Sequence, residues 1–200
     1  MKIITLITTL IFSISVFSQP SFEQLYQADL PRKALNISYD ESGKIKELTN
    51  SSWSDRIRKG EGFEYFKYEQ GYSYEKKQGF LRIYSNDGKL IEEKWDKSID
   101  GGITQEEALI AMEIFKQNED VIRQFNTTDQ QLVIYTGFNF LDKTECSPGN
   151  RCVHVIAASP EVSVLAHSIV RLTDSSVPYP EYSMETTYAR QKLSQSKSTK

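Results

Sequence analysis

The clearest hydrophobic pattern in the chain spans residues 104–125 and predicts one long amphipathic helix. Apolar residues recur there at the spacing of a single buried face: Ala108, Ala111, Met112, Phe115, Ile122 and Phe125. Thr104 and Glu107 have the spacing of a capping box at the helix start. Polar residues at 118–120 interrupt the stripe, which leaves a kink or a break into two helices open. Core packing is the ordinary role of such a stripe, and a partner-binding face is the alternative.

The chain before this helix has the shorter period of β-strands. Residues 34–39 and 44–49 flank a Glu-Ser-Gly turn and predict a hairpin, whereas the polar residues 50–62 predict an irregular connection. An aromatic-rich run over 63–84 is divided into strands by Gly71 and Gly79. The Asn-Asp-Gly sequence at 86–88 then predicts a tight turn into a further strand.

Three strongly apolar runs follow the helix, at 131–141, 152–158 and 162–172, and predict covered strands. The predicted fold class is therefore α+β: an antiparallel β-meander followed by one long helix packed on a C-terminal antiparallel sheet. The predicted organisation is a signal peptide at 1–18, the meander at 19–102, a helix with three strands at 103–182, and a flexible tail at 183–200. The meander and the helical part are one continuous domain or two small ones.

The first 18 residues have the pattern of a secretory signal peptide, with Lys2 before an apolar run of about 15 residues. That run is shorter than the roughly 20 residues of a membrane-spanning helix, although an uncleaved anchor is the alternative. No second apolar span follows. We therefore expect a soluble protein that is secreted or periplasmic, with no membrane span after cleavage. A net charge of −3 argues against nucleic acid as the main partner.

Two resemblances add to these patterns. The helix start at Glu106, Glu107 and Ala108, with the strands that follow, resembles the PepSY-type module over residues 103–177. That module is a cystatin-like α+β unit of peptidase propeptides and secreted bacterial proteins, so the resemblance implies such a fold and no catalytic residues. The meander also resembles β-hairpin repeats of secreted bacterial proteins, because residues 39–47 and 84–92 share the pattern Y-x-x-x-G-K-[IL]-x-E.

The residues with reactive or metal-binding chemistry are few. Cys146 and Cys152 are the only cysteines, and their close spacing in a secreted chain predicts a disulfide. A metal site that uses Cys152 with His154 and His167 is the alternative, because thiolate and imidazole bind zinc and copper. Otherwise each histidine is predicted to pack within an apolar strand. We predict no cofactor, and no catalytic motif surrounds these residues.

The aromatic run supplies the best candidates for ligand binding, namely Tyr65, Tyr68, Tyr72 and Tyr74. Rings that fall on both faces of successive strands leave some side chains outside the core, where they can contact a partner. The ordinary alternative is that these aromatic residues only stabilise the sheet. We predict a non-catalytic interaction module that binds a protein or a glycan. The alternatives are a metal-binding protein or hydrolase that uses the two histidines, and a protease-inhibitor-like module.

Overall fold

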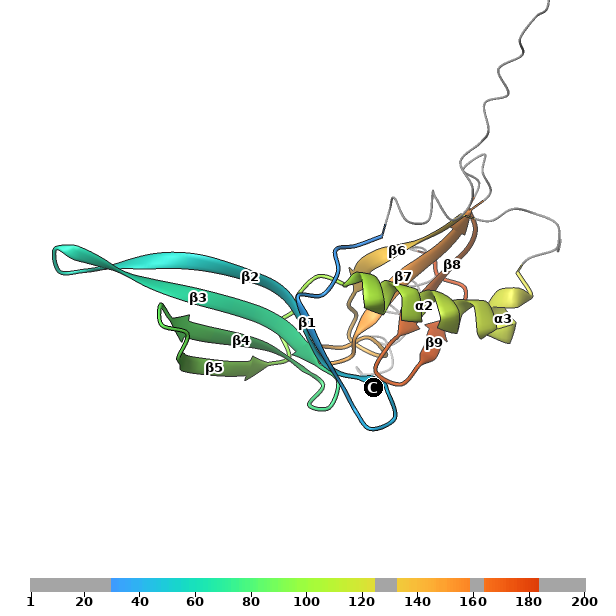
Figure 1. The fold of residues 1–200 in the computed structure, drawn as a ribbon. Coiled ribbons are helices and arrows are strands. Elements are labelled where there is room, and N and C mark those ends of the chain that lie inside the picture. Colours follow the sequence, from blue (N-terminus) through green and yellow to red (C-terminus); the bar gives the residue numbers. More distant parts are fainter. Residues whose placement is uncertain (1–29, 125–132, 159–163, 184–200) are drawn as a thin grey trace, which may run out of the picture.

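The computed structural model describes residues 30–124, 133–158 and 164–183, and these residues form two antiparallel sheets and two short helices (Figure 1). The first sheet contains β1 (Asn36–Tyr39), β2 (Ile45–Lys59), β3 (Gly62–Ser73), β4 (Gln78–Ser85) and β5 (Leu90–Asp96) in sequence order. The second contains β6 (Val133–Phe140), β7 (Cys152–Ala158), β8 (Val164–Arg171) and β9 (Ser176–Tyr179), also in sequence order. The helices α2 (Gln105–Gln117) and α3 (Glu119–Ile122) lie between the two sheets in the sequence.

The predicted fold class is wrong, because the described chain is mostly antiparallel β and its helices are short. The predicted helix at 104–125 ends at Gln117, and a second helix of 4 residues follows. Asn118 causes the break: its backbone is extended, and its side chain accepts hydrogen bonds from the N–H groups of Asp120 and Val121. A short amide that caps a new helix in this way competes with continuation of the old one. Phe125 lies outside the described residues.

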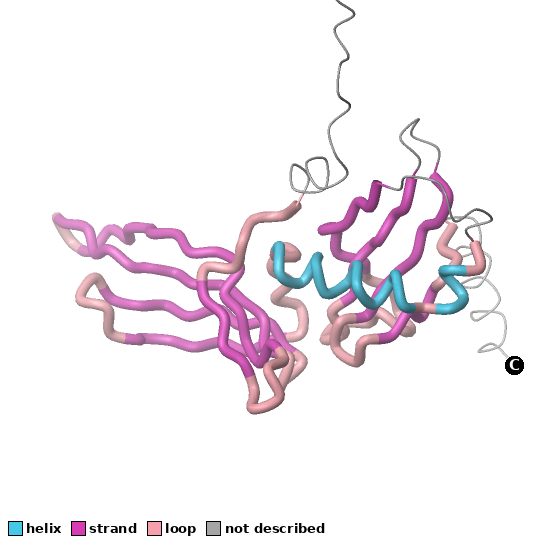
Figure 2. The backbone as a smooth tube through the Cα atoms, turned by 45° about the vertical axis from the view of Figure 1, so that its right-hand side comes forward, coloured by secondary structure: helices cyan, strands magenta, loops and turns pink. Residues whose placement is uncertain are grey.

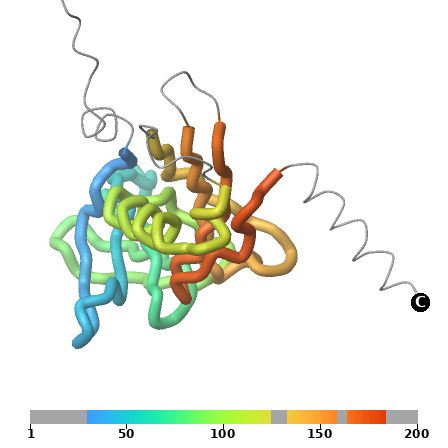
Figure 3. The backbone as a smooth tube through the Cα atoms, turned by 90° about the vertical axis from the view of Figure 1, so that its right-hand side faces the viewer, coloured from blue at the N-terminus to red at the C-terminus, as the bar shows by residue number. Residues whose placement is uncertain are grey.

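The start of α2 follows the sequence prediction. Thr104 and Glu107 form the capping box, with the Thr104 N–H donating to Glu107 Oε2 over 2.8 Å. One face of α2 packs on the second sheet and builds the larger hydrophobic core (Figures 2 and 3). That core includes Ala108, Ala111, Met112 and Phe115 of the helix and Ile134, Val153, Val155, Ala166 and Val170 of the strands.

Strand β2 is longer than predicted, because the polar residues 50–59 belong to it. Pairing explains the difference: each residue of this stretch from Ser51 onward lies opposite a residue of β3, with Trp53 facing Tyr68 and Arg56 facing Tyr65. The second sheet also has a fourth strand, β9, beyond the three strands predicted after the helix. Pro178 is tolerated there because β9 is an edge strand that pairs only with β8.

The signal peptide predicted at 1–18 and most of the tail predicted at 183–200 lie outside the described residues. The hairpin turn predicted at 86–88 is confirmed, with the Gly88 N–H donating to Ser85 O over 2.9 Å and Gly88 in the left-handed region at φ 83°.

Candidate functional site

The distal part of the β2–β3 hairpin, residues 51–68, projects away from the helix and the second sheet; we call it the arm (Figures 1 and 2). Strand β1 pairs with β2 only as far as Thr49, so it does not reach the arm. Strands β4 and β5 extend the sheet on the other side, and β4 pairs with β3 from Phe66 inward. Among the described elements, no helix and no second sheet covers either face of the arm.

One face of the arm and the adjoining strand carries a run of apolar side chains. Trp53, Tyr68 and Ile83 lie side by side across β2, β3 and β4, and the rings of Trp53 and Tyr68 stack with centroids 5.3 Å apart. Strand alternation places further apolar residues on this side. The Trp53 face comprises the apolar residues Trp53, Ile57, Phe66, Tyr68, Leu81 and Ile83, and the charged residues Asp55, Lys59 and Glu64 lie on the same side of the hairpin. Trp53 is 43% exposed and Ile57 54% exposed, whereas the other four apolar residues are partly buried, so the part of this face that is open to solvent centres on Trp53 and Ile57.

The opposite face carries charge as well as aromatic rings. The Tyr65 face comprises Arg56, Arg58, Phe63, Tyr65, Lys67 and Tyr84. The Arg56 guanidinium lies 4.6 Å from the centre of the Phe63 ring. Lys67 forms an ion pair with Glu69 at 2.8 Å. Neither Arg56 nor Arg58 has an ion-pair partner among the residues that the structure describes, so two guanidinium groups at neighbouring positions of this face are available.

The four tyrosines predicted as a binding group do not lie together. Tyr65 and Tyr68 are on opposite faces of the arm. Tyr72 is only 4% exposed, and its hydroxyl donates to Gly149 O over 2.7 Å. The Tyr74 hydroxyl donates to Glu107 Oε1 over 2.6 Å, and burial raises the pKa of both Tyr72 and Tyr74. Tyr72 therefore connects the first sheet to the disulfide loop and Tyr74 connects it to α2, and neither side chain is on the open surface.

The junction of the two sheets contains a buried ion pair that sequence reasoning missed. The Arg151 guanidinium donates to both carboxylate oxygens of Glu107, over 2.8 and 3.0 Å. It also donates to Asp100 Oδ1 and to the carbonyl oxygens of Gly101 and Gly102. Burial acts to raise the pKa of Glu107, but the charge and hydrogen bonds of Arg151 outweigh it and lower the pKa. The sequence predicted Glu107 as a helix-capping residue, whereas no sequence pattern indicated a role for Arg151.

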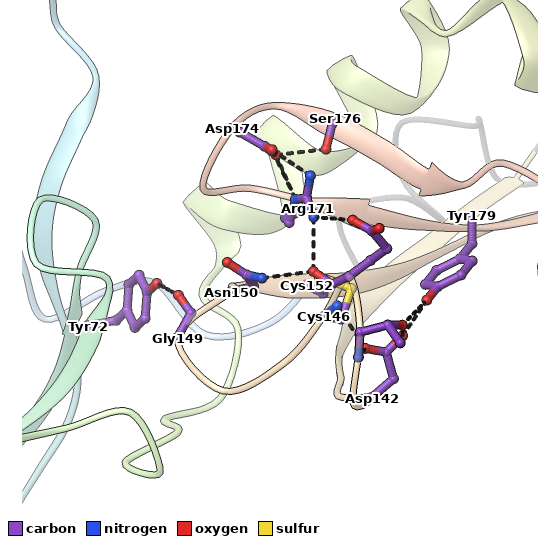
Figure 4. The surroundings of a disulfide bond; sticks show 12 residues. Tyr72, Asp142, Cys146, Gly149, Asn150, Cys152, Arg171, Asp174, Ser176 and Tyr179 are labelled. Atoms are coloured by element: carbon purple, nitrogen blue, oxygen red, sulfur yellow. Dashed lines mark hydrogen bonds and ion pairs between the residues drawn. A yellow bond between two sulfur atoms is a disulfide. The ribbon is translucent and has the colours of Figure 1, made fainter. Parts of the chain in front are cut away.

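The predicted disulfide is present in the structure, with Sγ atoms of Cys146 and Cys152 at 2.10 Å and Cα atoms 5.8 Å apart (Figure 4). Asp142 organises the loop, because its Oδ1 accepts hydrogen bonds from the N–H groups of Thr144 and Cys146. Gly149, in the same loop, accepts the hydrogen bond from Tyr72. The loop therefore holds the first sheet against the second.

His154 and His167 lie on neighbouring strands, with His154 Nδ1 2.9 Å from His167 Nε2. Phe140 and Tyr182 pack edge-on against His154, and Tyr182 packs edge-on against His167 as well. Burial, and then the nearby His167, lower the pKa of His154 to about 4; burial also lowers the pKa of His167. The disulfide removes Cys152 as a thiolate ligand. Within the described ranges, no group of three or more histidine, cysteine or acidic residues is placed to hold a metal ion.

A cleft of about 340 Å³ lies at the base of the arm. Its lining includes Arg32 and Asp100 together with Ser51 and Gln70. Ser51 and Gln70 face each other across β2 and β3, and Gln70 also faces Leu81 of the Trp53 face. The cleft therefore lies between the Trp53 face and the junction of the two sheets. Its lining residues there are mostly polar.

No family model matches this chain, and no curated protein matches it either. Among the helices of the described residues, none has the length and apolar content needed to cross a membrane.

Proposed function

We propose that this protein is a non-catalytic interaction module that binds a partner protein through the arm. The single observation that carries the proposal is the uncovered Trp53 face. A sheet with an apolar face is normally covered by another layer, and a large exposed apolar surface marks an interaction site. Trp53 and Tyr68 are also residue types that are enriched in protein interfaces.

The composition of the Trp53 face favours a protein over a glycan. Ile57, Leu81 and Ile83 supply aliphatic surface beside the two stacked rings. A sugar pressed against these side chains would bury hydroxyl groups without hydrogen-bond partners, which costs free energy. The apolar side chains of a protein would pack against these residues without that cost, and its polar groups would meet the charged Asp55, Lys59 and Glu64 on the same side.

The disulfide and the signal-like N-terminus support a location outside the cytoplasm. Disulfides persist in oxidising compartments, and the Cys146–Cys152 loop helps to hold the two sheets together. A secreted or periplasmic protein would therefore keep the arm presented to other proteins of the same compartment. The PepSY-type resemblance stays a prediction, and a non-catalytic role agrees with it.

The proposal is tested with residues 19–200 and a double variant, Trp53→Ser with Ile83→Ser. A matched control is Phe138→Ser, which removes an aromatic side chain that is 66% exposed and lies on the second sheet, away from the arm. All three proteins are immobilised and exposed to the extracellular and envelope proteins of the source cells, and to a glycan array. Differential scanning fluorimetry checks that each variant is folded.

We expect one or more proteins to be retained by the wild type and by the Phe138 variant, and lost with the double variant. The melting curves should show that all three proteins are folded, with the double variant less stable because Ile83 is partly buried and Trp53 stacks on Tyr68. Equal retention by the double variant would show that the Trp53 face is not the binding surface. Binding to glycans that depends on Trp53 and Ile83 would replace the protein partner with a sugar.

A further inference from the structure

The outer edge of β2 along the arm has no neighbouring strand among the described residues. Strand β1 pairs with β2 up to Thr49 and leaves residues 50–59 open on that side. A β-bulge at Asn50 separates the covered part from the open part. The open stretch contains no proline, although proline is one of the common means by which proteins block an exposed edge.

The pairing register shows which backbone groups point outward. Residues 60 and 61 form a two-residue loop between the paired residues Lys59 and Gly62. Such a loop closes on a hydrogen-bonded pair, and hydrogen-bonded pairs alternate with non-bonded pairs along an antiparallel ladder. Counting back from Lys59, the N–H and C=O groups that face away from β3 belong to Ser52, Ser54, Arg56 and Arg58. A strand placed along this edge can therefore bond to four residues.

The side chains of the same four residues determine the charge along this edge. Alternation puts their side chains on one side of the sheet, the Tyr65 face, where Arg56 and Arg58 have no ion-pair partner among the described residues. The neighbouring lysines are already paired, Lys59 with Glu64 and Lys67 with Glu69. The chain as a whole has a net charge of −3, so this is a local positive site on an acidic protein. It complements a strand with Asp or Glu at alternate positions.

A second copy of the chain fits the edge less well. In an antiparallel pair of two β2 strands centred on Asp55, this aspartate would face its own copy, and centring on Arg56 would do the same with arginine. Like charges directly opposite each other destabilise a strand pair. The charge pattern therefore disfavours these two self-pairings, whereas an acidic strand of a different chain can place its carboxylates opposite Arg56 and Arg58.

We propose that the open edge of β2 binds an extended acidic segment of a partner protein, which adds a strand to the first sheet. Backbone hydrogen bonds to Ser52, Ser54, Arg56 and Arg58 hold the segment, and its carboxylates pair with Arg56 and Arg58. This inference rests on the proposed function of the arm as a protein-binding surface and specifies the chemistry of the partner.

The test uses two ten-residue peptides with blocked ends, one alternating threonine and glutamate and the other alternating threonine and lysine. Binding to residues 19–200 is measured by isothermal titration calorimetry and by amide hydrogen exchange in NMR. Two variants separate the contribution of the backbone hydrogen bonds from that of the arginine charges. Ser54→Pro removes one outward N–H and leaves the β2–β3 bonds intact, and Arg56→Glu with Arg58→Glu reverses the charge.

We expect the glutamate peptide to bind, to protect the amides of Ser52, Ser54, Arg56 and Arg58, and to leave the exchange of Asp55 unchanged. Each variant should weaken binding at least 10-fold, and raising NaCl from 50 to 500 mM should weaken it in the wild type. The lysine peptide should not bind. Melting curves of both variants confirm that they are folded.

Three results would overturn the inference: no binding of the glutamate peptide, full binding by Ser54→Pro, or a concentration-dependent dimer of the wild type that Ser54→Pro abolishes. None of them refutes the proposed function. If partner proteins are still lost with the Trp53 and Ile83 double variant, the arm remains a binding surface and only the edge mechanism fails.

Discussion

Arg151 and Glu107 form a bidentate ion pair in the protein interior, although 44 residues separate them in the chain. Arg151 is 3% exposed and Glu107 is fully buried. Glu107 also caps α2 and accepts the Tyr74 hydroxyl of the first sheet, while Arg151 precedes the disulfide cysteine Cys152. The pair therefore connects the first sheet, the helix and the second sheet at one point.

Replacing Arg151 with methionine should lower the free energy of unfolding by about 3–5 kcal/mol, because Glu107 would remain buried without its partner. Urea unfolding followed by circular dichroism measures the change. The control is Arg123→Met, which breaks an exposed ion pair with Asp120 and should change stability by less than about 1 kcal/mol.

Adding Glu107→Gln to Arg151→Met should restore part of the lost stability, since the buried negative charge is removed while the amide oxygen can still accept the capping hydrogen bond from the Thr104 N–H. Equal losses in the single and double variants would show that packing, and not the ion pair, accounts for the role of Arg151.

Gly79→Ala should destabilise the protein by more than about 2 kcal/mol, because a Cβ atom there would lie 1.8 Å from Ile99 O. The loop after β5 would have to move to make room. Gly102→Ala is the matched control, as its Cβ would have no heavy atom within 4 Å. Thermal unfolding of the two variants measures the difference, and similar melting temperatures would contradict the close approach of Ile99.

Replacing both Cys146 and Cys152 with alanine should cost about 2–3 kcal/mol by the chain-entropy model for a loop of this length. Loss of the packed sulfur atoms adds to this cost, because both residues belong to the smaller core with Phe140 and Tyr179. Reductant should destabilise the wild type and leave the double variant unchanged. A wild type that is insensitive to reductant under unfolding conditions would mean that the disulfide does not form.

Stability should fall as the pH decreases from above 6.5 toward 4, through the histidine pair. The pKa of His154 is lowered from 6.5 to about 4 in the folded protein, chiefly by burial, so the unfolded chain binds the proton more tightly. The stabilisation is complete above pH 6.5 and is lost as the pH falls toward the folded pKa.

Chemical unfolding at pH 7.5 and pH 5.5 measures this loss, because most carboxylates stay ionised over that range. His154→Gln should reduce the difference between the two pH values. An identical pH dependence in the wild type and the variant would assign the effect to other groups.

Features that depend on neighbouring residues were predictable from the sequence. The capping box joins residues three apart, the turn at 86–88 needs one glycine in the left-handed region, and the disulfide closes a short loop. In each case the interacting groups are close in the chain, so the local pattern carries the information. The same kind of local pattern did not settle whether the helix breaks at Asn118, because capping of a new helix by Asn118 competes with continuation of the old one.

Tertiary structure decided the rest, because pairing between distant residues outweighs local preference. Residues 50–59 are polar and have no strand pattern of their own, yet pairing with β3 extends β2 to Lys59 and creates the arm. Register placed Tyr68 beside Trp53 on the open face and placed Tyr72 and Tyr74 in the junction. Register across β7 and β8 brought His154 to His167. The sequence therefore determined the local elements, and the long-range pairing of strands determined which side chains are buried and which can meet a partner.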